Sequence, residues 1–489
     1  MSAASRPPRR AATAFAACAA ALLTAAPASA APADLPDRVE VEGVHRHLIA
    51  LQRIADTHGG NRATGQPGYD ASVDYVAGKL RAAGFDVRTP EFRYQAYHLD
   101  SFALDVAGAP VQGEALEYSP ATPKGGITAP LSVAAVDETP GCEPTDYPAD
   151  VAGKVALVQR GSCSFADKQR VAAERGAVAA IIYNNTDGPL NGTLGDASAA
   201  RIPTAGVPGE AGRQLAGQAG APVHLDVQSR LENITARNVV AQTRTGRADN
   251  VVTAGAHLDS VPEGPGINDD GTGAAGLLET ALQLGGTPGT PNAVRFAFWG
   301  AEEAGLVGST EYVRSLTPEQ RLDIALYLNF DMIGSPNAGY FAYDGDNSDN
   351  VGAGPGPHGS AAIERDLAAA MADGGIRVQG TDFDGRSDYG EFIANGIPSG
   401  GLFTGAEDRK TEQQAAEWGG TAGQPYDPNY HSPKDDLSNV DRVALGRNST
   451  ALAKAIAAYA QSTEGVNGAG PRPMRTGQQP PMLGDRARE

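Results

Sequence analysis

A histidine and several aspartates lie close together between Val251 and Gly276, in the stretch VVTAGAHLDSVPEGPGINDDGTGAAG. An apolar run leads directly into His257 and Asp259, and Asp269 follows soon after. Buried parallel strands are near-continuous apolar runs, and functional groups of α/β proteins collect beyond their carboxyl ends. Imidazole and carboxylates gathered there have the donor chemistry of a divalent metal site. A histidine at a strand end can also be an ordinary hydrogen-bonded residue, so the rest of the chain must decide.

Acidic side chains and a second histidine occur at three further places of this kind. Glu302 and Glu303 follow the run FWGA, Asp331 follows LNF, and His431 lies in a loop rich in glycine and proline. Taken singly, a glutamate pair can cap a helix, an aspartate can end a strand and a loop histidine can be solvated. Their joint occurrence predicts a shared metal site.

A pair of zinc ions would account for the whole set. Two such ions about 3.5–4 Å apart need one bridging carboxylate and further ligands on each side. Adjacent glutamates allow one to bind metal while its neighbour, Glu302, acts as general base. Asp259 lies two residues beyond His257, on the same side of a strand, and can orient that imidazole. The predicted metal ligands are His257, Asp269, Glu303, Asp331 and His431.

The run from Gly271 to Gly276 also fits the dinucleotide-binding pattern G-x-G-x-x-G. Asp269 and Asp270 directly precede it, and they place negative charge where a pyrophosphate would dock. We therefore interpret these glycines as positions of close helix–strand packing.

Strands and helices alternate along the second half of the chain, as the spacing of apolar residues indicates. This alternation predicts an α/β fold with a mainly parallel or mixed sheet flanked by helices. The predicted strands are 85–92, 238–242, 251–257, 293–299, 324–330 and 397–403, and the predicted helices are 38–58, 69–83, 273–284, 360–372 and one beginning near 304.

Between residues 120 and 227 the composition changes to short Val, Ala and Ile runs punctuated by Gly and Pro. This segment has no cluster of His, Asp and Glu, so we interpret it as a smaller β-rich inserted domain and not as a second active site. Cys142 and Cys163 lie within it, and neither has a histidine beside it. In an exported chain such a pair predicts a disulfide in preference to a zinc site or a nucleophile.

The two ends of the chain are expected to lie outside the fold. Arginines, an apolar run and an Ala-Ser-Ala pattern predict a secretory signal peptide. No later stretch reaches the roughly 18 apolar residues of a membrane span, so a secreted, extracellular product is expected. The expected divisions are a signal peptide at 1–30, a catalytic domain at 31–119 and 228–464, the inserted domain at 120–227 and a disordered tail at 465–489.

The composition is that of a globular protein, with 489 residues, 41% of them hydrophobic. The formal net charge of −19 argues against a nucleic-acid partner, because nucleic-acid binding demands a basic surface. We expect a monomer with neither a nucleic-acid nor a membrane partner.

Several stretches of the chain resemble, in order, motifs of the secreted double-zinc aminopeptidases of the Streptomyces type. These enzymes belong to a zinc exopeptidase family that also includes glutamate carboxypeptidases. The segment 120–227 resembles a protease-associated domain, an insertion that some members carry, and its cysteine pair fits that module. The matching stretches, within residues 235 to 462, are AGAHLDS, GINDDGTGAAG, FWGAEEAGLVGS, LNFDMIGS, GRSDYGEF, GLFTGAE and YDPNYHSPKD.

The resemblance implies a role for each candidate residue. Glu302 would be the general base, Asp259 the partner that orients a liganding histidine, and Tyr430 the hydroxyl that stabilises the oxyanion. Arg386 would contact the substrate. In the metal centre, His257 and Asp331 would hold one zinc, Glu303 and His431 the other, and Asp269 would bridge them.

Two departures from the family pattern stand out. Related short enzymes have a cysteine on each side of the Tyr-His pair, where this chain has Asn429 and Lys434. They often carry His where this chain has Tyr389. Neither departure removes a predicted ligand.

The expected reaction is hydrolysis of the amino-terminal peptide bond of a peptide, and the resemblance implies a preference for hydrophobic residues such as leucine. A carboxypeptidase or dipeptidase on the same scaffold is an alternative, but it would need cationic groups for a terminal carboxylate, and Arg386 is the only arginine in a matching motif. A non-catalytic binding protein is a further alternative, and it should lack some of the ligands.

Overall fold

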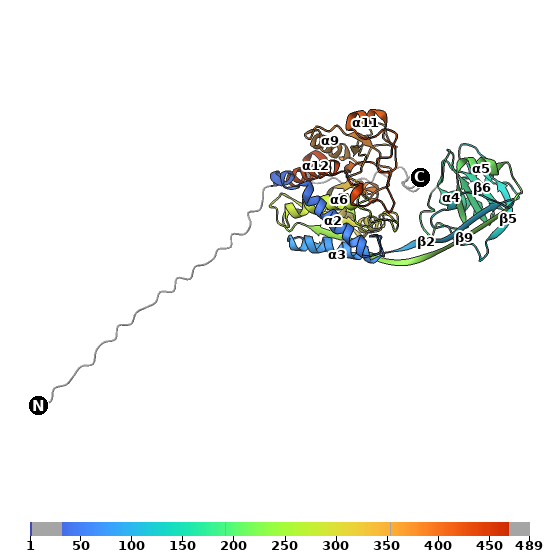
Figure 1. Cartoon of the computed structure of the whole chain (residues 1–489), viewed down its shortest axis with the longest axis horizontal. Coiled ribbons are helices and arrows are strands. Elements are labelled where there is room, and N and C mark those ends of the chain that lie inside the picture. The colour runs from blue at the N-terminus through green and yellow to red at the C-terminus, as the bar shows by residue number, and fades with distance from the viewer. Residues whose placement is uncertain (2–31, 191, 353, 469–489) are drawn as a thin grey trace.

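The computed structural model describes residues 1, 32–190, 192–352 and 354–468. The expected signal peptide and most of the expected tail therefore lie outside the described residues. Figure 1 shows two lobes joined by a two-stranded ribbon, and each lobe is built on an eight-stranded sheet. Within the described ranges, no helix has both the length and the apolar character needed to cross a membrane.

The sheet of the larger lobe has the strand order β1-β10-β12-β11-β13-β16-β14-β15. Strands β12, β11, β13 and β16 run parallel at its centre, whereas β1 and β10 pair antiparallel with their neighbours. Strand β14 pairs antiparallel with β16 and parallel with β15. The predicted α/β class with a mixed sheet is thus confirmed. The strands are β1 Asp86–Arg88, β10 Val239–Gln242, β11 Arg247–His257, β12 Asn292–Trp299, β13 Ile324–Phe330, β14 Phe341–Tyr343, β15 Gln379–Thr381 and β16 Ser399–Phe403.

Helices cover both faces of this sheet. Alternate residues of β12 enter different core clusters: Phe296 and Phe298 share one with residues of α2, α3, α6, α9 and α12, whereas Ala297 and Trp299 share another with residues of α7 and α10. This alternation follows from the period of two in a strand. The helices of the larger lobe are α1 Leu35–Arg38, α2 Val41–Thr57, α3 Pro67–Ala82, α6 Gly271–Leu284, α7 Val307–Ser315, α8 Pro318–Asp323, α9 Ser360–Ala372, α10 Gly390–Ala394, α11 Glu412–Trp418, α12 Arg442–Gln461 and α13 Glu464–Asn467.

The central strands end at one edge of the sheet. His257 in β11 is the register partner of Trp299 in β12, and Gly255 in β11 is the partner of Asn329 in β13. All three strands run parallel, so the residues that follow them emerge side by side. The register therefore brings together segments that are far apart in the sequence.

The smaller lobe has the strand order β3-β2-β9-β5-β6-β7-β8-β4 and, among its described residues, two α-helices. Its longest strands, β2 and β9, pair antiparallel from Glu91↔Arg237 to Val106↔Val223 and form the ribbon of Figure 1. The elements are β2 Glu91–Val106, β3 Ala109–Pro110, β4 Glu114–Ala115, β5 Ile127–Val133, β6 Val155–Gln159, α4 Phe165–Glu174, β7 Ala179–Tyr183, β8 Thr204–Val207, α5 Gly209–Ala216 and β9 Pro222–Arg237.

This sheet extends beyond the segment 120–227 that the sequence indicated. The middle of the ribbon is exposed or half-buried, as at Leu99 and Leu231, so the apolar alternation that marks a strand is weak there. The predicted strand 85–92 is also divided, because Thr89 and Pro90 separate β1 from β2.

Two elements at the carboxyl end were not predicted. Helix α12 is capped by Asp441, which accepts hydrogen bonds from two backbone N–H groups of its first turn. The predicted tail begins too early, because residues 464–467 form α13. Val466 is buried there, and the side chain of Asn467 donates to Asn250 at 3.1 Å.

Cys142 and Cys163 form a disulfide in the smaller lobe, as the sequence predicted, with their Cα atoms 5.8 Å apart. Replacing both with serine should destabilise this lobe by about 3 kcal/mol, because the bond no longer restricts the unfolded chain. Calorimetry of the variant and the parent protein would measure the loss. Two free thiols in the denatured, unreduced parent protein would contradict the pairing.

Candidate metal centre and active site

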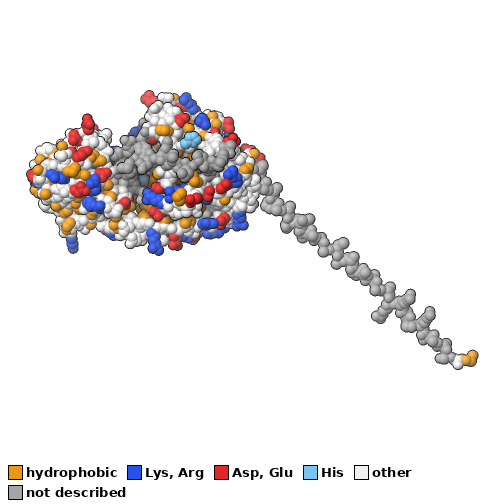
Figure 2. Space-filling model, turned by 180° about the vertical axis from the view of Figure 1, so that it is seen from behind, with side chains coloured by type: hydrophobic (Ala, Val, Ile, Leu, Met, Phe, Trp, Pro, Cys, Tyr) orange, Lys and Arg blue, Asp and Glu red, His pale blue; other side chains and the backbone are white. Residues whose placement is uncertain are grey.

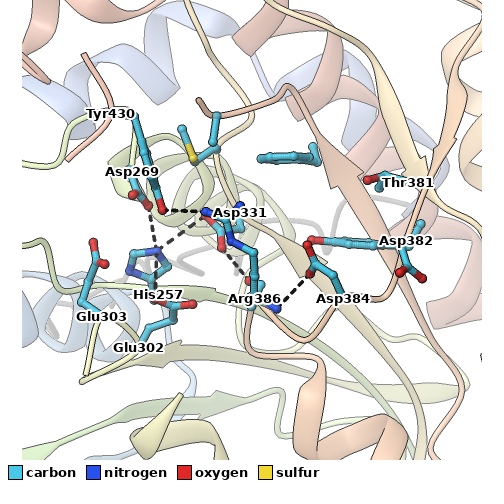
Figure 3. Close-up of a pocket in the computed structure, with 15 residues that line it drawn as sticks. His257, Asp269, Glu302, Glu303, Asp331, Thr381, Asp382, Asp384, Arg386 and Tyr430 are labelled. Atoms are coloured by element: carbon cyan, nitrogen blue, oxygen red, sulfur yellow. Dashed lines mark hydrogen bonds and ion pairs between the residues drawn. The ribbon is translucent and has the colours of Figure 1, made fainter. Parts of the chain in front are cut away.

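His257 is the last residue of β11 and is almost fully buried. Its Nδ1 lies 3.2 Å from the backbone oxygen of Asp259 and 3.6 Å from that residue's carboxylate. Its Nε2 faces the carboxylates of Asp269, at 3.0 Å, and Asp331, at 3.6 Å. One ring nitrogen is therefore held by Asp259, and the other points into a group of carboxylates (Figure 3).

Asp269 lies between two imidazoles. Its Oδ1 is 3.0 Å from Nε2 of His257, and its Oδ2 is 3.2 Å from Nε2 of His431. The backbone N–H groups of Asn268 and Asp269 donate to the two carboxylate oxygens of Asp435, at 2.8 and 3.0 Å. Asp435 therefore ties the segment that carries Asp269 to the loop that carries His431.

Asp331 and Glu303 add one carboxylate near each imidazole. Asp331 directly follows β13, and its Oδ2 accepts a hydrogen bond from Ser387 at 2.5 Å. Oε2 of Glu303 lies 3.1 Å from Nε2 of His431. The five predicted ligand positions thus form one continuous cluster.

Glu302 and Glu303 follow β12 but have different neighbours. The Oε2 atom of Glu302 lies 4.0 Å from Nε2 of His257, and its backbone N–H donates to Asp259 at 3.3 Å. Ala301 has a φ of 53°, in the left-handed region, so the chain turns sharply where the strand ends. This turn lets adjacent side chains approach different parts of the cluster.

A pocket opens beside the cluster (Figure 3). The ring of Tyr430 stacks on that of His431 with centroids 3.8 Å apart, and its hydroxyl accepts a hydrogen bond from Arg386 at 3.3 Å. Arg386 also pairs with Glu407 at 2.8 Å. The other walls are formed by Met332, Tyr343, Thr381, Asp382, Asp384, Ser387, Phe403 and Ala406.

The crowding of acids shifts several pKa values. Burial, together with the charges of Asp331 and Glu303, raises the pKa of Glu302 well above its usual value. Burial alone would lower the pKa of His431, but the charge of Glu303 and a hydrogen bond with Asp269 outweigh it and raise that pKa to about 11. The cluster therefore attracts positive charge, which a bound cation would supply in place of protons on the histidines.

Two buried oxygens of the cluster have no hydrogen-bond partner among the described residues, Oε1 of Glu303 and Oδ1 of Asp331. Unpaired buried polar atoms are costly, and metal coordination would satisfy them. Ligand atoms of His257, Asp269 and Glu303 all lie within 4.8 Å of one another. Imidazole and carboxylate are donors typical of hydrolytic zinc sites. The residues present fit a metal centre.

Four buried residues that hold this cluster were not predicted from the sequence. Asp435 and Ser387 are described above, and both stand in motifs that could have revealed them. Asp270 accepts hydrogen bonds from the backbone N–H groups of Gly273 and Met332, so it joins α6 to the segment after β13. The guanidinium of Arg62 donates to backbone oxygens of the loop between His257 and Asp269, and no motif marks it.

The glycines at the start of α6 serve close packing, as interpreted from the sequence. A Cβ atom on Gly273 would lie 2.0 Å from the backbone oxygen of Phe330. Asp270 caps this helix, and Asp269 precedes it, so carboxylates occupy the place of a nucleotide phosphate.

Residues 238–456 match the model of peptidase family M28, and residues 127–215 match that of the PA domain. The chain is 51% identical over 459 residues to a probable lipoprotein aminopeptidase, LpqL, of Mycobacterium tuberculosis, covering 93% of this chain and 89% of the relative. The chain belongs to peptidase family M28. It is therefore a zinc-dependent peptide hydrolase with an inserted PA domain, and not a non-catalytic binding protein.

Other members of family M28 support this assignment. The chain is 43% identical to leucine aminopeptidase 2 of Trichophyton rubrum over 438 residues, which are 88% of this chain and 86% of the relative. The solved structure of an aminopeptidase from Aneurinibacillus sp. strain AM-1 superposes with a TM-score of 0.71 at 28% identity, covering 91% of this chain and 98% of that one.

Proposed function

We propose that this member of family M28 is an exported aminopeptidase with two zinc ions. His257 and Asp331 would hold one ion, and Glu303 and His431 the other. The observation that carries this proposal is the position of Asp269, whose two oxygens face two different imidazoles. A carboxylate in that position is suited to bridging two ions. The relatives' names and the amino-terminal sequence support aminopeptidase activity and export.

The ions would polarise the substrate carbonyl and lower the pKa of the attacking water. Glu302 would accept a proton from that water and later donate it to the leaving amine. Its burial and its position 4.0 Å from His257 suit this exchange. The hydroxyl of Tyr430, held by Arg386, would donate a hydrogen bond to the oxygen on which charge develops. Asp259 would keep His257 in its orientation.

The charges around the cluster favour a substrate amino terminus over a carboxylate. Glu302, Glu303 and Asp331 all line the pocket and would attract an ammonium group. A carboxypeptidase would need a free cation there, but the guanidinium of Arg386 is paired with Glu407. Apolar walls, including Met332 and Phe403, suit apolar side chains such as that of leucine.

Leucine p-nitroanilide and its N-acetyl derivative would test the direction of attack. We expect hydrolysis of the free substrate and a kcat/KM at least about 100-fold lower for the acetylated one, because acetylation removes the charge that these carboxylates bind. A peptide with a free amino terminus and an amidated carboxyl terminus is the matched control and should be hydrolysed. Release of carboxyl-terminal residues instead would support the carboxypeptidase alternative.

A further inference from the structure

One wall of the pocket is built from three strand ends. Tyr343 ends β14, Thr381 ends β15 and Phe403 ends β16. Tyr343 and Thr381 are register partners, so they lie side by side. Met332, Tyr343 and Phe403 give the pocket lining apolar surface.

Two carboxylates belong to the same lining. Asp382 and Asp384 line the pocket and lie across it from His257 (Figure 3). Asp384 accepts hydrogen bonds from the hydroxyl of Tyr389 at 2.7 Å and from the backbone of Arg386 at 2.9 Å, and both end on its Oδ1. The other oxygen of Asp384 has no hydrogen bond assigned to it within the described chain.

Aromatic packing fixes this wall. Tyr389 is fully buried and meets Tyr343 edge to face, with ring centroids 4.7 Å apart. Phe383, between the two aspartates, stacks on Tyr343 at 5.1 Å. The segment that carries Asp382 and Asp384 is therefore held against the sheet, so both carboxylates have defined positions.

The surroundings add further negative charge. The loop from Asp344 to Asp349 packs on the same strand, since Asp349 accepts a hydrogen bond from the backbone of Gly380 at 2.6 Å. The one arginine of this wall, Arg386, is paired with Glu407. Among the described residues that line this end of the pocket, the carboxylates Asp382 and Asp384 outnumber the guanidinium of Arg386. A leucine side chain would need only apolar surface.

We propose that this pocket binds long cationic side chains, those of lysine or arginine, at the substrate's amino-terminal residue. The inference rests on the proposed aminopeptidase activity and extends its substrate class beyond apolar residues. The methylene stem would lie along Met332 and Phe403, and the cationic end would reach Asp382 and Asp384. Lysine and arginine commonly bury their stems in this way while their charge meets polar groups.

Lysine and norleucine p-nitroanilides provide the test, because norleucine has the same stem without the ammonium group. The measured quantity is the ratio of kcat/KM for lysine to that for norleucine. We expect a ratio above one in the parent enzyme that falls about fivefold to tenfold in Asp382→Asn or Asp384→Asn. High salt should also lower the ratio, by screening the ion pair. Asp346→Asn, an exposed change in the adjacent acidic loop, is the matched control and should leave the ratio within about twofold.

Each outcome decides the proposal. A parent ratio well below one, or a ratio that neither pocket variant lowers, would overturn it. An equal fall of the ratio in Asp346→Asn would also overturn the proposal. The general negative charge of this region, and not contact with the two carboxylates of the pocket, would then explain the preference for lysine. If one pocket variant fails to fold, the other still tests the assignment. Absence of hydrolysis of both p-nitroanilides by the parent enzyme would instead refute the proposed aminopeptidase activity.

Discussion

Replacing Asp269 with alanine is expected to abolish turnover, with the largest loss of any single substitution in this protein. Among the described residues, Asp269 is the one carboxylate paired with both His257 and His431, at 3.0 and 3.2 Å. Its loss would remove a ligand from both proposed zinc sites and leave two like-charged ions without the anion between them. We expect the zinc content to fall from about two per chain to below one, and kcat to fall by at least about 10⁴-fold. Metal analysis and kinetics on the same preparation would measure both.

Chelation should reproduce this loss in the parent protein, and added zinc should reverse it. Asp408→Ala is a suitable control, because this aspartate is exposed and lies outside the pocket. Full activity after exhaustive removal of metal would refute the two-zinc proposal. Normal zinc content in Asp269→Ala would refute the bridging role alone.

Substitutions of the adjacent Glu302 and Glu303 are expected to have different effects. Glu302→Gln keeps the shape of the side chain but removes the group that accepts a proton, so kcat should fall by about 10²–10⁴-fold. Both zinc ions should remain, because Glu302 is not a proposed ligand. Glu303→Gln should lose the zinc shared with His431 and also lower the melting temperature, because bound metal stabilises the folded state.

The comparison uses two isosteric changes at neighbouring positions, so differences in side-chain volume do not contribute. Zinc content, melting temperature and kcat are measured for both variants. Glu302→Asp, which withdraws the carboxylate by one methylene, should be intermediate in rate and normal in zinc content. A zinc lost from Glu302→Gln and retained in Glu303→Gln would require the two roles to be exchanged.

The sequence predicted the core of the larger lobe well. Strand β13 and helix α9 match the predicted ranges, and β11 ends at His257 as expected. These elements are marked by continuous apolar runs or helical periodicity, both of which are local properties of the chain. The ribbon of β2 and β9 was missed because its middle lacks a buried face, so no local pattern distinguishes it.

The candidate site, too, was predicted only in part from the sequence. Residue types and their positions after apolar runs identified His257, Glu303 and Asp331, since a strand that is buried on both faces delivers its next side chains to one edge of the sheet. Motif resemblance assigned roles to them. Neither the residue types nor the motif resemblance could show that Asp269 points one oxygen at each histidine.

Only the tertiary structure revealed which residues hold the site. Arg62 lies between α2 and α3, far from the cluster in sequence, and yet its guanidinium supports the loop before Asp269. Asp435 clamps the backbone of the same segment. The acidic end of the pocket likewise depends on the pairing of β14 with β15. Local patterns determine strands, helices and their ends, whereas contacts between distant segments depend on register and packing, and a single sequence does not display these.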